Sequence, residues 1–254
     1  MTQPRRKGKL SAGSGRANGP QRRITRPHPT GTPTPTMESC TTRAAFATTL
    51  LAGGHSRRMG QDKAALVIDE QPLWQRQLQL LRRLRPSGCA VACRRAQGLH
   101  LQGAQDIAWL HDPEPCNEGP MGAIVRALEW FFPLPVLVLA VDLPAMTLPT
   151  LEAIGIDPSC GCLPSIDQRF EPAASLYTAA MLPILQEHLR AGQRRLQLAL
   201  AECAALQLAR VWPIPAAMRR DFLNVNSAPD WQAALPHLGA ANKVKLDCAP
   251  PPAP

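Results

Sequence analysis

Apolar residues follow two kinds of pattern along the chain, short continuous runs and longer runs with helical spacing. The apolar, threonine-rich run at 46–51 is suited to a buried strand. The run at 136–141 is uninterrupted, which is typical of a parallel strand covered on both faces. Between them, large apolar residues recur at spacings of four, three and three, which predicts one buried face of a helix. These residues are Trp74, Leu78, Leu81 and Leu84.

Three shorter apolar runs predict further strands, at 64–68, 89–93 and 107–110. The last of them is followed directly by His111 and Asp112. A helix with an apolar stripe is expected to open at Gly119. Strands that alternate with helices predict an α/β fold, here a Rossmann-like three-layer sandwich with a mostly parallel sheet. In such sheets ligands bind beyond the carboxyl ends of the strands.

The pattern is looser in the C-terminal part of the chain. Residues 160–164 and 171–177 are expected to form edge strands, followed by a covering helix. A short apolar strand is expected before Asn224. Ser227 is a candidate N-cap of the last helix, with Asp230 at its third position as a partner for the helix dipole.

Composition divides the chain into three parts. Residues 1–43 are rich in Pro, Gly, Thr and Arg and hold almost no large apolar residue, so we expect a disordered basic tail. Residues 44–240 are expected to form one domain, and 241–254 a flexible C-terminal tail. The sequence leaves open whether translation starts at Met1 or at Met37.

The formal net charge of +9 suggests an acidic partner, but its distribution argues against nucleic acid. Residues 1–45 hold nine Lys/Arg and one acidic residue, which leaves 19 basic and 18 acidic residues in the remainder. Aromatic residues make up only 4% of the chain, too few for an RNA-stacking surface. We therefore expect no nucleic acid partner.

The cysteines and the apolar runs indicate in which cellular compartment the protein resides. The eight cysteines include no C-x-x-C pair, which favours free thiols in a reducing cytosol. The longest apolar run, 131–141, is interrupted by Pro133 and Pro135 and is too short to cross a bilayer. No apolar segment suited to a secretory signal occurs near the N-terminus. We expect a cytoplasmic protein without membrane association.

The candidate chemistry begins where the run at 46–51 ends. Gly53 and Gly54 form a turn whose backbone N–H groups can face an anion. Arg57, Arg58 and Lys63 follow within a few residues, and charge-assisted bonds to phosphate contribute about 1.5–3 kcal/mol each. Neither G-x-x-x-x-G-K-[ST] nor G-x-G-x-x-G is present. The predicted ligand is a polyphosphate.

Residues 51–63 read L-A-G-G-H-S-R-R-M-G-Q-D-K, which resembles the signature of the molybdenum cofactor guanylyltransferases, a branch of the nucleotidyltransferases. The resemblance implies a GT-A-like nucleotidyltransferase fold and transfer of GMP from Mg-GTP to the molybdopterin-bound molybdenum cofactor. The products would be molybdopterin guanine dinucleotide and pyrophosphate. It also implies Mg²⁺ as the cofactor, GTP and molybdopterin as substrates, and molybdoenzymes or their chaperones as candidate partners.

The same resemblance implies roles for particular residues. Lys63 and Arg58 would be catalytic cations, whereas Arg57 falls where the family varies. Asp142, in V-D-L-P, would be the magnesium ligand and a catalytic residue. Asn224 and Asn226 match an N-V-N element on the acceptor side. The implied nucleotide-binding residues are Leu51, Ala52, Gly53, Gly54, Lys63, Asp112, Gly119 and Asp142. A turn or helix-cap role is the alternative for each aspartate and asparagine.

One departure from the family leaves the base open. The family carries an Asn-x-Asn-like element where this chain has Val91, Ala92 and Cys93, none with an amide. Guanine could be bound by Asp112 and by backbone groups, and L-A-G-G favours guanine over cytosine. The alternatives are cytidylyl or other nucleotidyl transfer to molybdopterin or another phosphorylated metabolite, and a non-catalytic nucleotide-binding protein that delivers the cofactor.

Overall fold

The computed structural model describes residues 45–54, 62–102, 106–114 and 118–238. All described residues belong to one compact unit, Thr42–Pro254. The tails expected at the two ends of the chain lie outside the described residues and stay predictions. Within the described ranges, no helix has the length and apolar character needed to span a membrane.

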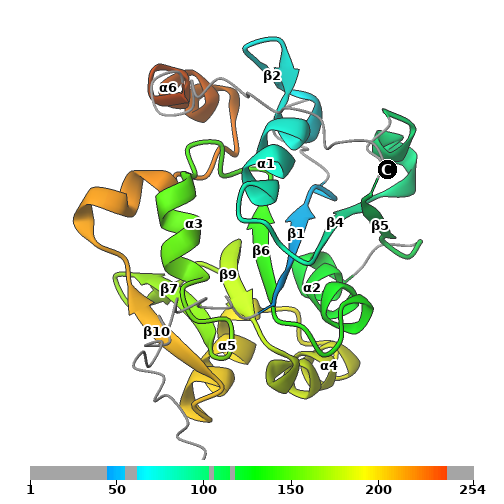
Figure 1. The fold of residues 1–254 in the computed structure, drawn as a ribbon, viewed down its shortest axis with the longest axis vertical. Helices are drawn as coiled ribbons and strands as arrows, with labels where there is room; N and C mark the ends of the chain where they lie inside the picture. Colours follow the sequence, from blue (N-terminus) through cyan, green and yellow to red (C-terminus); the bar gives the residue numbers. More distant parts are fainter. Residues whose placement is uncertain (1–44, 55–61, 103–105, 115–117, 239–254) are drawn as a thin grey trace, which may run out of the picture. The chain divides into compact units, whose positions relative to one another are not determined.

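The centre of the fold is a set of parallel strands (Figure 1). β1 (Ala47–Leu51) lies between β4 (Gly88–Cys93) and β6 (Val136–Ala140) and is parallel to both. β5 (Ala108–His111) continues the sheet beyond β4, again in parallel. Each of these four strands begins and ends within one residue of the bounds that the sequence patterns predicted. Because the chain leaves β1 toward β4 and later returns to its other side as β6, the strand order reverses at β1, where open sheets bind ligands.

The sheet extends beyond β6 through strands of mixed direction. β9 (Ala174–Tyr177) is antiparallel to β6, and β7 (Gly161–Ile166) is antiparallel to β9. β10 (Ala209–Pro213) is parallel to β7 and forms the edge, while β8 (Arg169–Phe170) pairs with the end of β7. The order is β10-β7-β9-β6-β1-β4-β5, so the sheet is mostly parallel, as predicted.

The expectation that 160–164 and 171–177 are edge strands is wrong. Both segments form interior strands, because β10, which the apolar pattern did not reveal, covers β7. All four residues of β9 are fully buried. A run of four residues carries too little pattern to distinguish a strand covered on both sides from one at an edge.

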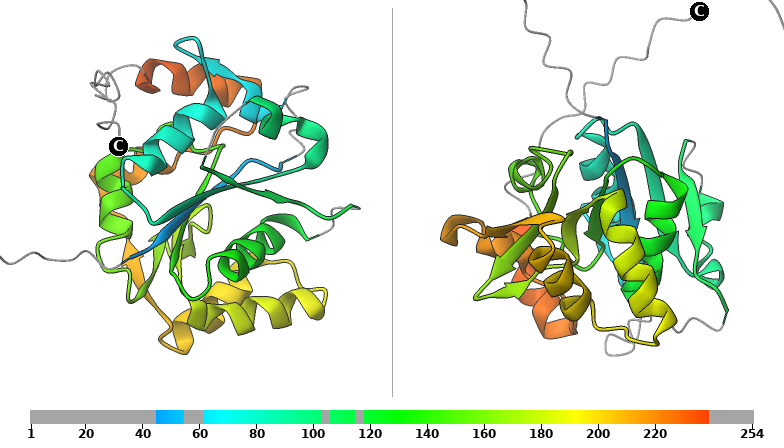
Figure 2. Two further views of the ribbon diagram at one scale, coloured as in Figure 1. Left: turned by 45° about the vertical axis from the view of Figure 1, so that its right-hand side comes forward. Right: turned by 90° about the horizontal axis from the view of Figure 1, so that it is seen from below.

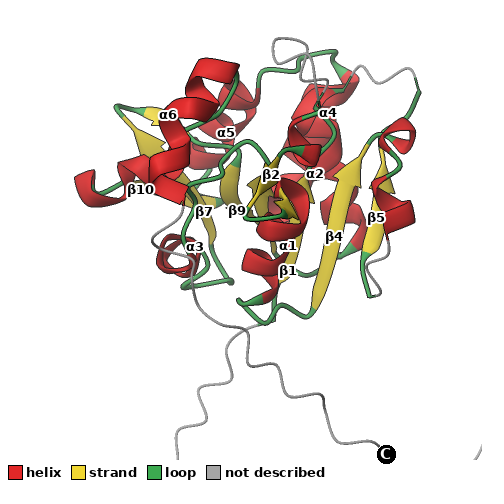
Figure 3. Ribbon diagram, turned by 90° about the horizontal axis from the view of Figure 1, so that it is seen from above, coloured by secondary structure: helices red, strands yellow, loops and turns green. Residues whose placement is uncertain are grey.

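Helices cover both faces of the sheet (Figures 2 and 3). Those on one face are α1 (Leu73–Arg82), α3 (Leu148–Ile154) and α6 (Ala228–Leu238). Those on the other are α2 (Gly119–Trp130), α4 (Leu182–Arg190) and α5 (Leu196–Ala205). Short 3-10 helices are η2 (Arg95–Gln97), η3 (Leu99–Gln102) and η4 (Ala179–Met181). The three-layer α/β sandwich is therefore confirmed.

The alternation of side chains along β6 explains the two layers. Leu137 and Leu139 pack into the core under α1, whereas Val136 and Val138 pack into the core under α2. Successive residues of a strand point to opposite faces. Because helices cover both faces of the sheet, all four side chains are fully buried. The predicted apolar face of α1 is confirmed as well, since Trp74 and its partners at helical spacing are all buried.

The predicted strand at 64–68 is wrong in its first half. Lys63–Ala65 forms a 3-10 turn, η1, and only β2 (Val67–Ile68) is extended, in a separate hairpin with β3 (Gln71–Pro72). The Asp62 carboxylate accepts a hydrogen bond from the Ala64 N–H at 3.0 Å. This local bond stabilises a turn in a segment whose apolar pattern indicated a strand.

The strand expected before Asn224 is also wrong, because the segment forms a 3-10 helix, η5 (Ala216–Phe222). The predicted N-cap of α6 is confirmed. The Asp230 N–H donates to Ser227 Oγ at 3.3 Å, and the Asp230 carboxylate accepts from the N–H groups of Asn226 and Ser227, each at 2.9 Å. These bonds, chiefly that from Asn226, hold the pKa of Asp230 below its ordinary value.

Candidate active site

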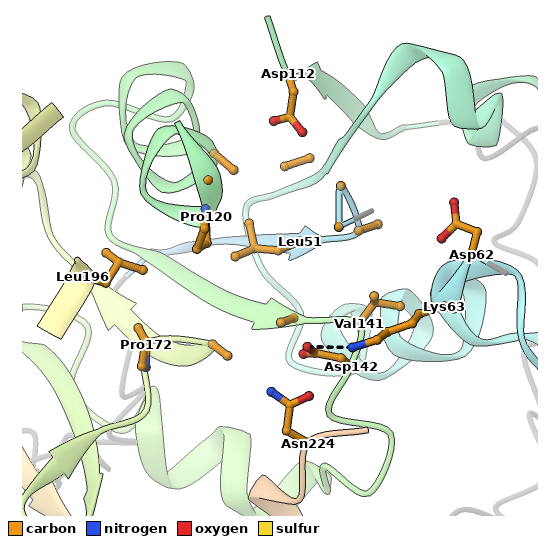
Figure 4. Close-up of a pocket in the computed structure, with 18 residues that line it drawn as sticks. Leu51, Asp62, Lys63, Asp112, Pro120, Val141, Asp142, Pro172, Leu196 and Asn224 are labelled. Atoms are coloured by element: carbon orange, nitrogen blue, oxygen red, sulfur yellow. Dashed lines mark hydrogen bonds and ion pairs between the residues drawn. The ribbon is translucent and has the colours of Figure 1, made fainter. Parts of the chain in front are cut away.

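A cavity of about 620 Å³ lies at the carboxyl ends of β1, β4, β5 and β6 (Figure 4). It brings together most of the residues that the sequence singled out. Those in its lining are Leu51, Ala52, Gly53, Gly54, Lys63, Asp112, Gly119, Asp142 and Asn224. Asn226 is not in the lining, and Arg57 and Arg58 lie outside the described residues. The predicted meeting of the glycine turn and Asp142 in one crevice is confirmed, whereas the role of each residue stays a prediction.

The cavity has a charged end and an apolar end (Figure 4). Lys63 and Asp142 lie at the charged end with Asn224 beside them. Pro120, Leu196 and Pro172 line the other end. No local pattern indicated that these apolar residues would meet, because they come from three segments that approach one another only in the folded chain. A charged group at one end and a flat apolar group at the other would fit this arrangement.

Lys63 joins η1 to the end of β6 and to the N-V-N segment. Its Nζ lies 3.5 Å from Asp142 Oδ2 and donates a hydrogen bond to Asn226 Oδ1 at 2.8 Å. Both members of the ion pair are largely buried, with side chains 13% and 24% exposed, so solvent screens the pair less than a surface pair. Lys63 is thereby fixed where its ammonium group reaches the cavity.

Asp142 is suited to hold a divalent cation. Its Oδ1 is buried and has no hydrogen-bond partner within the part of the chain that the structure describes. The same described ranges contain no group of three or more His, Cys, Asp or Glu side chains that could hold a metal by themselves. Mg²⁺ is usually held by one or two carboxylates together with substrate phosphates, and a single carboxylate with an unpaired oxygen fits that mode.

The two glycines of the turn are needed for different reasons. A Cβ on Gly53 would lie 2.5 Å from Asp112 Oδ2, so a side chain there would have to displace the Asp112 carboxylate. A Cβ on Gly54 would meet nothing within 4 Å. The space beside Gly54 is therefore open to a ligand. Gly53, in contrast, lets the turn pack closely against Asp112.

Arg126 of α2 fixes Asp112. The Asp112 carboxylate is buried, its Oδ1 accepts a hydrogen bond from Arg126, and its backbone N–H donates to the Cys93 carbonyl at 3.0 Å. Arg126 also pairs with Glu118 at the start of α2. One carboxylate oxygen of Asp112 is thus committed to Arg126, and the other faces Gly53. Only the folded chain places Arg126 here, since nothing in the spacing of these residues indicates the pairing.

The end of β4 offers no polar group for reading a base. Val91, Ala92 and Cys93 are all buried. The Cys93 sulfur lies 3.8 Å from His111 Nδ1, and burial raises the pKa of its thiol to about 11, so the thiol is neutral near pH 7. The described cysteines, of which Cys93 is one, are all free thiols.

The N-V-N segment bridges β6 and Lys63. The Val225 N–H donates to the Asp142 carbonyl at 2.9 Å, which ties the segment to the end of β6. Asn224 faces the cavity, and Asn226 faces Lys63. The segment is anchored on its other side by buried Asp221, whose Oδ2 accepts hydrogen bonds of 2.6 Å from the hydroxyls of Thr147 and Thr150.

We expect Asp221→Ala to lower the free energy of unfolding by about 2–3 kcal/mol, because it removes a buried charged acceptor and leaves the hydroxyls of Thr147 and Thr150 only the 3.2 Å bond between them. Urea unfolding of both proteins measures the change. Arg219→Ala is the control, because Arg219 lies in the same η5 and its ion pair with Asp167 is exposed, so the pair should contribute no more than about 0.5 kcal/mol. Equal stability of the two variants would contradict the anchoring role of Asp221.

Solved structures share this fold, and their names include nucleotidyltransferases. Over 75% of this chain and 97% of the other, the fold matches molybdopterin-guanine dinucleotide biosynthesis protein A from Archaeoglobus fulgidus, with a TM-score of 0.61 and 21% identity. It also matches CTP:phosphocholine cytidylyltransferase from Streptococcus pneumoniae over 77% and 100% of the chains, with a TM-score of 0.56 and 11% identity.

Sequence comparison identifies the family. Residues 48–206 match the MobA-like NTP transferase domain, and the chain belongs to this family. A probable molybdenum cofactor guanylyltransferase from Synechococcus elongatus is 34% identical over an aligned length of 198 residues, and the alignment covers 74% of this chain and 97% of that protein. A molybdenum cofactor guanylyltransferase from Serratia proteamaculans is 28% identical over 191 residues, 72% of this chain and 92% of that protein.

Proposed function

We propose that this protein transfers GMP from magnesium-bound GTP to the molybdopterin form of the molybdenum cofactor, with release of pyrophosphate. The observation that carries the proposal is the ion pair of Lys63 with Asp142 at the charged end of a cavity that the glycine turn also lines. The activity named for the relatives supports the same reaction. Molybdoenzymes or their chaperones are the proposed recipients of the product.

In the proposed reaction, a phosphate oxygen of the acceptor attacks the α-phosphorus of GTP, and the bond from that phosphorus to the bridging oxygen of pyrophosphate breaks. No covalent enzyme intermediate is needed, because the acceptor phosphate is already an anionic nucleophile. Lys63 offsets the repulsion between the two phosphate groups, and Asp142 would hold Mg²⁺, which supplies further charge neutralisation when bound. Positioning and preorganised charge therefore account for catalysis.

The proposal of guanine rests on Asp112. The Watson–Crick edge of guanine presents N1–H and N2–H donors, which a carboxylate can accept, whereas cytosine presents the N3 acceptor at the corresponding place. Asp112 lines the cavity and keeps one oxygen free of Arg126. The fold itself does not select the base, because the cytidylyltransferase from Streptococcus pneumoniae shares it.

A nucleotide panel tests the function. Purified protein is incubated with Mg²⁺, molybdopterin cofactor and each of GTP, CTP, ATP and UTP, and both pyrophosphate and the dinucleotide product are measured. We expect GTP to exceed every other nucleotide by at least about tenfold in kcat/KM, equivalent to about 1.4 kcal/mol of discrimination. Preference for CTP would establish the cytidylyl alternative. Tight binding of GTP without pyrophosphate release would favour a cofactor-delivery protein.

The two asparagines of the N-V-N segment should have separable effects. Asn226→Ala removes the acceptor that orients Lys63, so we expect kcat to fall about tenfold. Asn224→Ala removes a cavity-lining amide, so we expect a higher KM for molybdopterin and a kcat within about threefold of wild type. Steady-state kinetics with varied acceptor distinguishes them. Identical profiles for the two variants would mean that both asparagines serve the acceptor.

A further inference from the structure

We infer that Arg94 and Gln97 are positioning residues that fasten both ends of the loop between β1 and η1. The inference rests on the proposed nucleotide site and extends it to two residues outside the cavity lining. Both follow the carboxyl end of β4 and lie at the edge of the sheet where the glycine turn also lies.

The first end of the loop is held through its backbone carbonyls. Arg94 donates from Nε to the Gly53 carbonyl at 3.0 Å and from NH2 to the Gly54 carbonyl at 3.5 Å. Gln97 donates from Nε2 to the Ala52 carbonyl at 2.8 Å. Three consecutive carbonyls are thereby fixed. Because C=O and N–H point in opposite directions in a trans peptide plane, these bonds direct the N–H groups of Gly53 and Gly54 away from Arg94 and Gln97.

The second end is held through the carboxylate of Asp62. Gln97 Nε2 donates to Asp62 Oδ2 at 2.6 Å, and Arg94 NH2 lies 3.6 Å from the same oxygen. The other oxygen of Asp62 accepts from the Ala64 N–H and forms the turn that starts at Lys63. The two side chains therefore join the glycine turn to the residue that precedes the catalytic lysine.

This arrangement should matter for binding more than for folding. A backbone anion site must present several N–H groups at once, and ordering a glycine-containing segment costs conformational entropy. When Arg94 and Gln97 order the segment before the nucleotide arrives, binding avoids that cost. Arg94 and Gln97 are only partly buried, and neither belongs to the two hydrophobic cores, so their loss should leave the fold intact.

The test compares Arg94→Met and Gln97→Leu with Arg95→Met, which removes the same charge from the adjacent, exposed residue. The Kd of Mg-GTP is measured without acceptor, together with the melting temperature. We expect the Kd to rise about 10- to 100-fold in Arg94→Met and about 3- to 10-fold in Gln97→Leu, with no change in Arg95→Met. The melting temperatures should stay within about 3 °C of wild type, equivalent to about 1 kcal/mol for a domain of this size.

Amide hydrogen exchange of the nucleotide-free protein provides the readout that a merely structural role would not give. We expect faster exchange at 52–54 and 62–65 in Arg94→Met and Gln97→Leu, with β1 and β6 unchanged. Wild-type exchange and Kd in both variants would overturn the inference, as would loss of protection throughout the sheet. If Arg94→Met fails to fold, Arg94→Lys replaces it in the test, because lysine keeps the charge but cannot reach both carbonyls. The same Kd and exchange criteria then apply to Arg94→Lys and Gln97→Leu.

The failure of this inference can be told apart from failure of the proposed function. Absence of pyrophosphate release by the wild-type protein with GTP and molybdopterin would refute the function. The exchange measurement needs neither substrate, so it still decides whether Arg94 and Gln97 hold the loop.

Discussion

Asp142→Asn is expected to fold normally and to lose at least about two orders of magnitude in turnover. The substitution keeps the size and shape of the side chain but removes the charge that would hold Mg²⁺ against the substrate phosphates. A residue that served only as a turn or cap would tolerate asparagine with a loss of a few tenths of a kcal/mol. Pyrophosphate release across a magnesium titration measures the difference, and the variant should bind GTP with little magnesium dependence.

The ion pair with Lys63 offers a second explanation for such a loss, and Asn226→Ala separates the two. If Asp142 acted only by orienting Lys63, its asparagine variant would resemble Asn226→Ala, with lower turnover and an unchanged magnesium concentration at half-saturation. If Asp142 is a metal ligand, Asp142→Asn should need a higher magnesium concentration for half-saturation, and Asn226→Ala should not. Superimposable titrations of wild type and Asp142→Asn would refute the metal assignment and weaken the enzyme hypothesis.

Lys63→Met should remove about 10- to 100-fold or more of the transferase activity while leaving the fold intact. Lys63 contributes one charge-assisted contact to phosphate, about 1.5–3 kcal/mol, and its long apolar stem is matched by that of methionine. The effect should fall on kcat/KM for GTP. Initial rates at saturating acceptor, with GTP varied, measure it.

The control for Lys63→Met is Arg83→Met, which removes one positive charge at the exposed end of α1. We expect wild-type kinetics from this variant, because exposed charges beyond a Debye length of about 8 Å are largely screened at physiological salt. Turnover near the wild-type value in Lys63→Met would exclude Lys63 from the site. An equal loss in both variants would indicate a general effect of net charge instead.

Local patterns predicted the elements that form the centre of the fold. β1, β4 and β6 were recognisable because a parallel strand buried on both faces needs a continuous apolar run, as at 136–141. α1 was recognisable because its buried residues keep helical spacing. The strand predicted at 64–68 was wrong in its first half because one hydrogen bond from the Ala64 N–H to the Asp62 carboxylate outweighed a weak pattern. The interior place of β9 was beyond prediction, since strand order depends on which segments pack together.

The sequence by itself determined much of the candidate site, because several of its residues are consecutive or directly follow a strand. Parallel strands end at the same edge of a sheet, so Gly53, Gly54 and Asp142 had to approach one another once the strands were known. Lys63 followed from the continuous motif at 51–63.

Only the tertiary structure decided how these residues are held. Arg94 meets Gly53 across 41 positions of sequence, and Asn226 meets Lys63 across 163. Arg126 and Asp112 are 14 positions apart but lie on different elements. Side-chain pairs of this kind leave no periodic trace in the sequence, because each depends on the relative placement of two packed elements and not on the local spacing within either one.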